Sequence, residues 1–385
     1  MKAKNIKQLL FYLAFVVIAL PLSQDMLQFI GSGALKGSYK LADDTSFSVQ
    51  GWLSGAYQQK KEKYINDNTG FRPDFIRLIN QIDYSLFDKC HAGWDIKGKD
   101  RCVFQFPYID AYHGKDYVGY ERIYKRCTKL KAIQDTMARI GKHLIIAFLP
   151  SKASFYPEFF PDNRLEQTWG MTNYKAYLQL CDSLGLNLID MDAWFRSMKS
   201  TSKEPLFSKQ GIHWTVYGAI LGGDSLTRYM ELLTNIEVEH PDWSEIEHTD
   251  EPRMGDDDVA SEMNLIFPVA KETLAYPKIK EIRDTAGRKL NAIYIGDSYM
   301  TKMILNGVIQ KMNKQCEYWS YFEEMHDLYQ YRYAPIAEYD WKGAMKTADC
   351  IVIAYTLFNL RDFGSGFIES AYDYYYPKDT TRSLR

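Results

Sequence analysis

The chain has 385 residues, of which 46% are hydrophobic and 25% are charged, and its formal net charge is −2. This length and composition predict a globular protein with one large α/β domain or two smaller ones. The near-neutral charge excludes an electrostatic argument for nucleic-acid binding. The aromatic content of 15%, with 29 tyrosines, fits a carbohydrate groove and fits ordinary core and surface tyrosines equally well.

The N-terminal segment carries a targeting signal. Three lysines lie within the first seven residues, and an uncharged, largely apolar stretch follows over residues 8–24. This pattern is typical of a signal or anchor sequence. We expect an uncleaved signal-anchor segment over residues 1–34 with its N-terminus in the cytoplasm, and a cleaved signal peptide is the alternative. Both interpretations place residues 35–385 outside the cytoplasm.

Hydrophobic patterns along the remaining chain predict alternating helices and strands. The expected helices cover residues 45–85 with a break at 67–70, then 118–140, 172–184, 193–199 and 215–233. Apolar runs predict buried strands over residues 144–149, 186–190, 291–296, 315–320 and 350–355. Strands that alternate with helices predict an α/β fold with a doubly wound parallel sheet flanked by helices. An acidic insertion at about residues 236–285 interrupts this pattern.

Six cysteines occur without any Cys-x-x-Cys pair, so the sequence supports neither a zinc ribbon nor a thioredoxin motif. Cys127 and Cys350 lie within apolar patterns and are predicted to be small core residues. Cys90 and Cys102 flank a turn rich in glycine and lysine, and a disulfide between them is possible in an oxidising compartment.

The most informative motif is Gly296-Asp297-Ser298, which ends an apolar run and precedes a predicted helix. A serine at such a turn lies at a helix N-terminus, where free backbone N–H groups stabilise an oxyanion. Earlier in the chain, His213 lies where another predicted helix begins, and it can accept the serine proton. The structural alternatives are an N-cap serine and a packed aromatic histidine. As a pair, Ser298 and His213 predict acyl-ester chemistry.

A base histidine normally has a carboxylate that holds its tautomer, and the sequence leaves the identity of this group open. The position two residues before His213 is Gly211, which has no side chain to do this. Asp192 and Asp258 are the preferred substitutes, and another aspartate or a backbone carbonyl is a further option.

Two more polar residues follow predicted strands, where ligands of parallel sheets bind. Lys152 either contacts an anionic sugar or an oxyanion, or is a solvated lysine at a strand end. Asn359 either donates to an oxyanion or caps a turn.

In their order along the chain, these motifs resemble a known family. The Gly-Asp-Ser motif at 296–298 and the His-Trp-Thr motif at 213–215 are similar to those of the periplasmic SGNH-hydrolase-like acetyltransferases of exopolysaccharide O-acetylation, the alginate O-acetyltransferase group and its DHHW relatives. The histidine precedes the serine here, as in that circularly permuted branch. Gly211 stands where the family pattern has an aspartate. The resemblance covers about residues 45–375, with further similar segments at 64–72, 99–114 and 149–158.

The resemblance implies a two-step acetyl transfer in which Ser298 carries the acetyl ester and His213 is the base. The implied acceptor is a hydroxyl of an exported or cell-surface polysaccharide, and the implied donor partner is a membrane-bound O-acyltransferase. No metal or dissociable cofactor is implied. Two alternatives stay open, a carbohydrate acetyl esterase and a membrane-tethered polysaccharide-binding or assembly protein that the loss of aspartate at Gly211 has made inactive.

Overall fold

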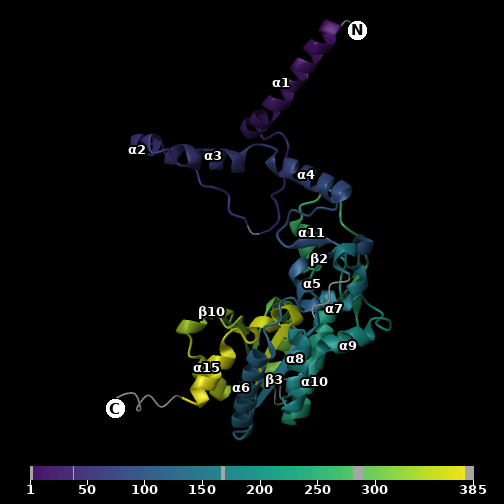
Figure 1. The fold of residues 1–385 in the computed structure, drawn as a ribbon, viewed down its shortest axis with the longest axis vertical. Helices are drawn as coiled ribbons and strands as arrows, with labels where there is room; N and C mark the ends of the chain where they lie inside the picture. Colours follow the sequence, from purple (N-terminus) through teal and green to yellow (C-terminus); the bar gives the residue numbers. More distant parts are fainter. Residues whose placement is uncertain (1–2, 38, 166–169, 281–289, 378–385) are drawn as a thin grey trace. The chain divides into compact units, whose positions relative to one another are not determined.

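The computed structural model describes residues 3–37, 39–165, 170–280 and 290–377, and Figure 1 shows its elements. Three sequence predictions reach beyond these residues: the anchor segment at residues 1–2, the acidic insertion at 281–285, and the extracytoplasmic domain at 38, 166–169, 281–289 and 378–385. The chain divides into two compact units. The N-terminal unit comprises Met1–Gly93 and Ala260–Val269, and the sheet unit comprises Trp94–Val259 and Ala270–Arg385.

The N-terminal unit is helical, as predicted for residues 45–85. Its helices are α1 (Ala3–Leu27), α2 (Val49–Leu53), α3 (Ala56–Asn68) and α4 (Arg72–Phe87). The predicted break lies between α3 and α4, where Thr69 is extended and Phe71 is left-handed with a φ of 63°. The returning segment 260–269 is held by α4, since Asn80 donates to the Met263 carbonyl at 2.8 Å.

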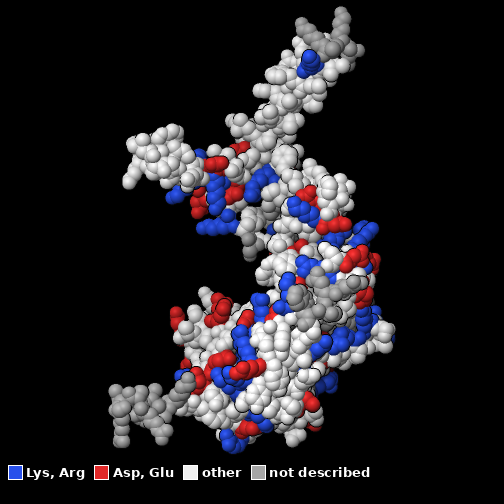
Figure 2. Space-filling view, viewed as in Figure 1, with Lys and Arg blue, Asp and Glu red and all other residues white. Residues whose placement is uncertain are grey.

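The first helix has the properties of a membrane segment. Residues Asn5–Leu27 have a mean hydropathy of 1.9, and within the described part of the chain only this helix is long and apolar enough to cross a membrane. Figure 2 shows its surface almost without charged side chains. A helix of this kind serves as a membrane anchor or as a signal sequence.

The sheet unit is built on seven strands in the order β10-β9-β8-β7-β11-β3-β4. Their bounds are β3 (His143–Leu149), β4 (Leu188–Asp190), β7 (Leu290–Gly296), β8 (Asn313–Ser320), β9 (Glu324–Asp327), β10 (Arg332–Pro335) and β11 (Cys350–Thr356). The five predicted strands are all present and pair in parallel. The antiparallel hairpin of β9 and β10 was not predicted, because neither strand contains an apolar run.

Helices cover both faces of this sheet. The α-helices of the unit are α5 (Phe106–His113), α6 (Tyr120–Ala138), α7 (Lys152–Phe155), α8 (Asn173–Ser183), α9 (Met191–Met198), α10 (Val216–Thr234), α12 (Ser298–Leu305), α13 (Val308–Met312), α14 (Trp341–Thr347) and α15 (Phe367–Tyr375). The short helix α11 (Asp258–Glu262) begins in this unit and ends in the N-terminal unit. Two small antiparallel sheets of two strands each complete the unit, β1 (Asp95–Lys97) with β2 (Val103–Gln105), and β5 (Ile246–Thr249) with β6 (Leu274–Pro277).

The packing of the core explains why the sequences of the central strands are continuous apolar runs. Along β11, Ile351 and Ile353 belong to the cluster that includes α6, α8 and α15. Val352 points to the opposite face and is equally buried, and on that face the hydroxyl of Tyr294 contacts Met230 of α10. Because both faces are covered, every residue of β11 is buried, and the predicted doubly wound α/β fold is confirmed.

Cys90 belongs to the N-terminal unit and Cys102 to the sheet unit, and the proposed disulfide between them stays a prediction. Cys102 is completely buried, and burial raises the pKa of its thiol, so its side chain is part of the interior. Cys127 and Cys350 are both fully buried, as predicted.

Candidate active site

Ser298 occupies the strand-to-helix turn that the sequence predicts. Strand β7 ends at Gly296, Asp297 is the N-cap, and Ser298 is the first residue of α12. A Cβ atom at Gly296 would lie 2.4 Å from the Ala354 carbonyl oxygen. Glycine is therefore needed for β11 and the turn to approach this closely. The turn places Ser298 at the carboxyl edge of the parallel sheet.

Asp297 is a structural residue of this turn. Its side chain is fully buried and accepts hydrogen bonds from the Tyr299 amide at 3.1 Å, the Thr356 amide at 2.8 Å and Nδ2 of Asn359 at 2.8 Å. Burial raises the pKa of this carboxyl group. Asp297 thus ties the ends of β7 and β11 together and makes no recorded contact with the His213 ring.

His213 lies directly against the serine. Its Nε2 is 2.8 Å from Oγ of Ser298, although the two residues are far apart in sequence. The imidazole packs on the ring of Tyr299 with 4.6 Å between centroids. The Tyr299 hydroxyl in turn donates to the Ile212 carbonyl at 2.5 Å. The residue after the nucleophile therefore fixes the loop that carries the histidine.

Asp258 supplies the carboxylate that the sequence left open. Its Oδ2 accepts a hydrogen bond from Nδ1 of His213, and its Oδ1 accepts from the backbone amides of Ile212 at 2.8 Å and Val259 at 2.9 Å. With the Nδ1 proton held by Asp258, Nε2 is free to accept the Ser298 proton. Burial alone raises the pKa of Asp258, but the hydrogen bond and charge of His213 outweigh it and lower that pKa below its usual value.

The same geometry explains the glycine at 211. A Cβ atom there would lie 2.7 Å from the Asp256 carbonyl oxygen and 2.9 Å from Oδ1 of Asp258. Both contacts are shorter than real Cβ contacts. The space next to Gly211 is therefore filled by the segment that delivers Asp258.

Asp192, the other preferred substitute, does not orient His213. Its side chain is 1% exposed and accepts hydrogen bonds from the Ser151 amide at 3.2 Å and from the Ser154 hydroxyl. It also pairs with Nε of Arg196 at 2.8 Å. These partners engage both oxygens at the end of β3, so Asp192 is a local structural carboxylate.

A buried ion pair joins the Asp258 segment to the serine helix, and sequence reasoning missed it. Oδ1 of Asp256 accepts from Nζ of Lys302 at 2.6 Å and from the Val216 amide at 3.1 Å. Lys302 lies one turn after Ser298 on α12, and Val216 begins α10 directly after the histidine loop. The signal in the sequence was the run of three aspartates at 256–258, from which we had selected Asp258 alone as a candidate.

Lys152 is not the exposed lysine that we expected. Its side chain is completely buried, and Nζ donates to the carbonyls of Lys209 at 3.0 Å and Gly211 at 2.6 Å. Burial lowers the pKa of this amine. Because the ammonium has no exposed surface, it does not contact a substrate, and it instead holds the loop that precedes His213.

A tyrosine that sequence reasoning did not select lies at the nucleophile. The backbone amide of Ser298 donates to the Tyr321 hydroxyl at 3.2 Å. Tyr321 follows β8 in a left-handed conformation with a φ of 48°, which non-glycine residues seldom adopt. Burial raises the pKa of Tyr321, so its hydroxyl keeps its proton and can also donate. Asn359 is close by and donates to Asp297. Its predicted role as an oxyanion donor stays a prediction.

The described residues contain no group of three or more His, Cys, Asp or Glu side chains placed to hold a metal ion. The side chains of Ser298, His213 and Asp258, together with backbone amides, are the described groups at this site that can take part in acyl transfer.

Residues 111–273 match the model of a protein family described as the SGNH hydrolase-like domain of the acetyltransferase AlgX. This stretch includes His213 and Asp258 and ends before Ser298. The resemblance to the SGNH-hydrolase-like O-acetyltransferases is thereby confirmed. This part of the chain is therefore similar to an AlgX-type SGNH hydrolase-like domain.

Curated relatives agree with this family. The chain is 22% identical over 201 residues to a probable alginate O-acetylase AlgJ of Pseudomonas syringae pv. tomato, covering 51% of this chain and 49% of the relative. It is 23% identical over 188 residues to the corresponding Azotobacter vinelandii protein, covering 48% and 45%. The chain thus spans about half the length of the curated relatives it matches.

Two solved structures are also similar. The O-acetyltransferase domain of Pseudomonas putida AlgJ aligns with a TM-score of 0.49 and 18% identity, over 73% of this chain and 100% of that domain. Pseudomonas aeruginosa AlgX aligns with a TM-score of 0.44 and 11% identity, over 70% of this chain and 67% of that protein.

Proposed function

We propose that the chain is an O-acetyltransferase that moves an acetyl group through a serine ester onto hydroxyls of an exported or cell-surface polysaccharide. The observation that carries this proposal is the continuous hydrogen-bonded series from Ser298 Oγ to His213 Nε2 and from His213 Nδ1 to Asp258. A nucleophile, a base and an orienting carboxylate in this arrangement are the parts that acyl transfer requires.

In the first step, Oγ of Ser298 attacks the carbonyl carbon of an acetyl ester or thioester donor. Its proton passes to Nε2 of His213 and then to the leaving alcohol or thiol, so that Ser298 ends as an acetyl ester. The Asp258 carboxylate stabilises the imidazolium that forms between these two transfers. Its lowered pKa keeps it ionised for this role.

The negative charge on the tetrahedral intermediate needs donors at the nucleophile. The Ser298 amide lies at the N-terminus of α12 and is the nearest backbone donor. Its present acceptor is the protonated Tyr321 hydroxyl. In our proposal the acetyl oxygen takes over this N–H, and Tyr321 donates to the same oxygen.

In the second step, His213 removes the proton from a sugar hydroxyl, and the resulting alkoxide attacks the acetyl ester of Ser298. The sugar gains the acetyl group, and Oγ of Ser298 regains its proton from His213. If water replaces the sugar, the product is free acetate. The transferase and an esterase therefore differ only in which hydroxyl reaches the acetyl-serine.

The partners belong to the same proposal. The curated relatives are named alginate O-acetylases, which supports a polysaccharide acceptor. The apolar α1 helix supports anchoring at a membrane, with the sheet unit at the periplasmic face of the inner membrane. A membrane-bound O-acyltransferase is the proposed source of acetyl groups.

The main alternative was a binding protein made inactive by the glycine at 211. That alternative depended on the absence of a carboxylate for His213. The hydrogen bond between Asp258 and His213 supports the transferase over this alternative, because it offers the histidine a carboxylate from another segment.

The test uses the full-length chain in a polyoxyethylene detergent with a small chromogenic acetate and alginate oligosaccharides. We expect the peptide containing Ser298 to gain one acetyl group and the oligosaccharides then to become acetylated. Ser298→Ala should abolish both signals, whereas Ser320→Ala, a serine at the end of the neighbouring strand, should keep them. Free acetate as the sole product at every acceptor concentration would make the protein an esterase. An absence of any acetyl-serine would reject the proposal.

A further inference from the structure

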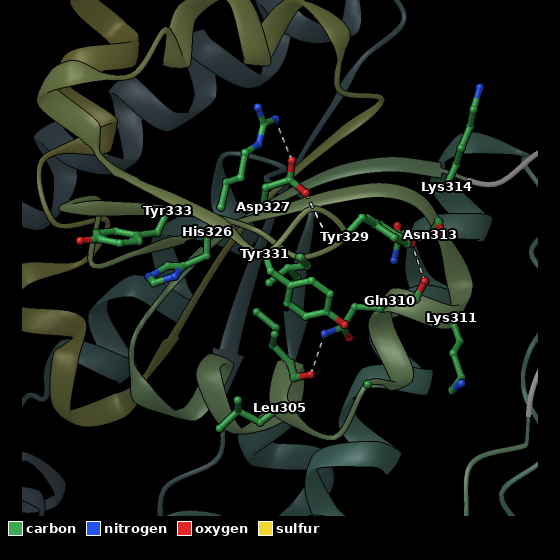
Figure 3. A pocket seen from close by; sticks show the side chains of 14 residues that line it. Leu305, Gln310, Lys311, Asn313, Lys314, His326, Asp327, Tyr329, Tyr331 and Tyr333 are labelled. Carbon is green, nitrogen blue, oxygen red and sulfur yellow. Dashed lines mark hydrogen bonds and ion pairs between the residues drawn. The ribbon is translucent and has the colours of Figure 1, made fainter.

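A second site lies at the opposite end of α12 from Ser298, beside the hairpin of β9 and β10. The pocket there has a volume of about 930 Å³, which is in the range of ligand sites. Figure 3 shows its lining side chains, with tyrosines and a histidine from the hairpin on one side and the α12–α13 region on the other. Ser298 and Leu305 are the ends of the eight-residue α12, so about 10 Å of helix separates them.

An aromatic row crosses the sheet into this pocket. Tyr318, His326 and Tyr333 are register neighbours on β8, β9 and β10. The His326 ring stacks on Tyr318 with centroids 5.9 Å apart and on Tyr333 with centroids 6.3 Å apart, at interplanar angles of 24° and 26°. The buried end of the row contacts the nucleophile turn, because the Tyr318 hydroxyl donates to the Asp297 carbonyl at 2.9 Å.

The outer end of the row is open to solvent. Tyr333 on β10 is 70% exposed, and Tyr331, in the turn just before β10 with a φ of 51°, is 93% exposed. Neither hydroxyl makes a hydrogen bond to any described residue. Tyr329, in contrast, donates to the Gln310 carbonyl at 2.5 Å and forms a fixed wall of the pocket. Exposed aromatic rings next to a hollow mark a binding surface more often than an ordinary surface does.

The charged residues at the pocket indicate the class of ligand. Its lining includes Lys311, Lys314 and Arg332, and the acidic residue among the lining, Asp327, is already paired with Arg332 at 3.2 Å. In Figure 3 the two lysines lie at the end of the pocket opposite Tyr333. Rigid tyrosine rings bind the faces of sugars, and nearby lysines attract carboxylates.

We propose that this pocket, which we call the hairpin pocket, binds a segment of a carboxylate-bearing polysaccharide. The inference rests on the proposed function, since the bound chain is the acceptor whose hydroxyls reach Ser298. Tyr331 and Tyr333 stack on sugar rings, and Lys311 and Lys314 contact the carboxylates of neighbouring sugars. The site holds the polymer about one helix length from the nucleophile, so that different hydroxyls of one bound chain can be acetylated in turn.

The test is calorimetric titration of the full-length chain carrying Ser298→Ala, in a polyoxyethylene detergent, with alginate oligosaccharides of defined length. We expect the double variant Tyr331→Ala/Tyr333→Ala to raise the Kd at least about tenfold. The matched control is Tyr120→Ala/Tyr124→Ala, which removes an exposed stacked tyrosine pair with centroids 6.2 Å apart on α6 and should leave the Kd unchanged. Neutral cello-oligosaccharides of equal length should bind at least about tenfold more weakly, and added salt should weaken alginate binding.

Equal Kd values for the hairpin and α6 variants, or equal binding of the neutral and acidic sugars, would overturn the inference. No measurable binding of alginate by the parent would also overturn it. Turnover of a small acetate separates this result from the proposed function, because such a substrate does not need the hairpin pocket. If the parent binds alginate but does not turn over the small acetate, the proposed function is rejected and the proposed binding role of the hairpin pocket is retained.

Discussion

At the scale of single residues, the site differs from the family pattern in the position of the aspartate that contacts the histidine. The family pattern has an aspartate two residues before the histidine, and this chain has Gly211 there. The carboxylate that contacts His213 comes instead from Asp258, and its oxygen lies where a side chain at 211 would begin. Gly211 and Asp258 therefore depend on each other. The space beside His213 accommodates the side chain of Asp258 only because residue 211 has no side chain.

The lack of space for a side chain at Gly211 can be tested by substitution. Gly211→Ala should lower the free energy of unfolding by about 1–3 kcal/mol, because the new Cβ collides with Asp256 and Asp258. The φ of Gly211 is not in the left-handed region, so this loss is steric. Gly211→Asp should be worse, since it adds a second negative charge beside Asp258, and it should lower ester turnover as well. Urea unfolding and turnover of a small acetate measure both effects, and higher activity in Gly211→Asp would contradict this account.

The sequence was informative about some site residues and not others, for physical reasons. Ser298 and His213 lie in short motifs next to predicted element ends, so their neighbourhood could be inferred from the parallel sheet. Asp258 lies in an irregular acidic segment, and its contact with His213 depends on long-range folding that no local pattern encodes. Lys152 was misjudged because a lysine at a strand end is usually solvated, whereas here two backbone carbonyls bind it in the interior.

At the scale of elements, the position of α12 depends on the buried pair of Lys302 and Asp256. Lys302→Met should lower the free energy of unfolding by about 3–5 kcal/mol, because it leaves the Asp256 carboxylate buried without its cation. Urea unfolding measures this change. The double variant Lys302→Met/Asp256→Asn should recover part of the loss, since it removes the uncompensated charge. A loss in the double variant as large as the sum of both single losses would show that the two residues do not interact.

The end of α10 contains a pH-dependent contact. Nδ1 of His240 is 2.6 Å from Asp224 and Nε2 is 3.0 Å from Glu231. The hydrogen bond to Asp224 is the main reason that the pKa of His240 is raised above 6.5. A raised histidine pKa means that this contribution to stability is complete below pH 6.5 and is lost as the pH rises through the folded-state pKa.

We therefore expect His240→Gln to lower the free energy of unfolding more at about pH 5.5 than at about pH 9. Chemical unfolding of both proteins at the two pH values measures this difference. Asp224 has a lowered pKa and so stays ionised across this range. An equal effect of the substitution at both pH values would contradict the assignment.

How well each strand could be predicted from the sequence depended on how completely the strand is buried. Strands β3, β7 and β11 are covered on both faces and appear in the sequence as apolar runs, so they were predicted closely. The hairpin of β9 and β10 lies at the sheet edge, and its short strands have mixed polarity, so no periodicity indicated it. The hairpin pocket depends on this hairpin and could not have been inferred from the sequence.

At the scale of the whole molecule, the sequence indicated an anchor followed by one extracytoplasmic domain beginning at residue 35. In the structure, the N-terminal unit extends to Gly93 and includes the returning segment Ala260–Val269. That return could not be predicted, because residues 260–269 join the unit through contacts with α4 that are distant in sequence. The boundary of the anchor at residue 34 stays a prediction.

Asp258 is the carboxylate that contacts His213, and we propose that it completes the site. The most direct test compares turnover of a small acetate by the full-length parent with that of Asp258→Asn, Asp257→Asn and Asp192→Asn, each checked for folding by its unfolding curve. We predict that Asp258→Asn lowers kcat by about 10³–10⁴, the loss expected when a triad histidine loses its carboxylate. Asp257→Asn should retain parental kcat, and Asp192→Asn should change stability more than kcat. Parental kcat in a folded Asp258→Asn variant would contradict the central claim.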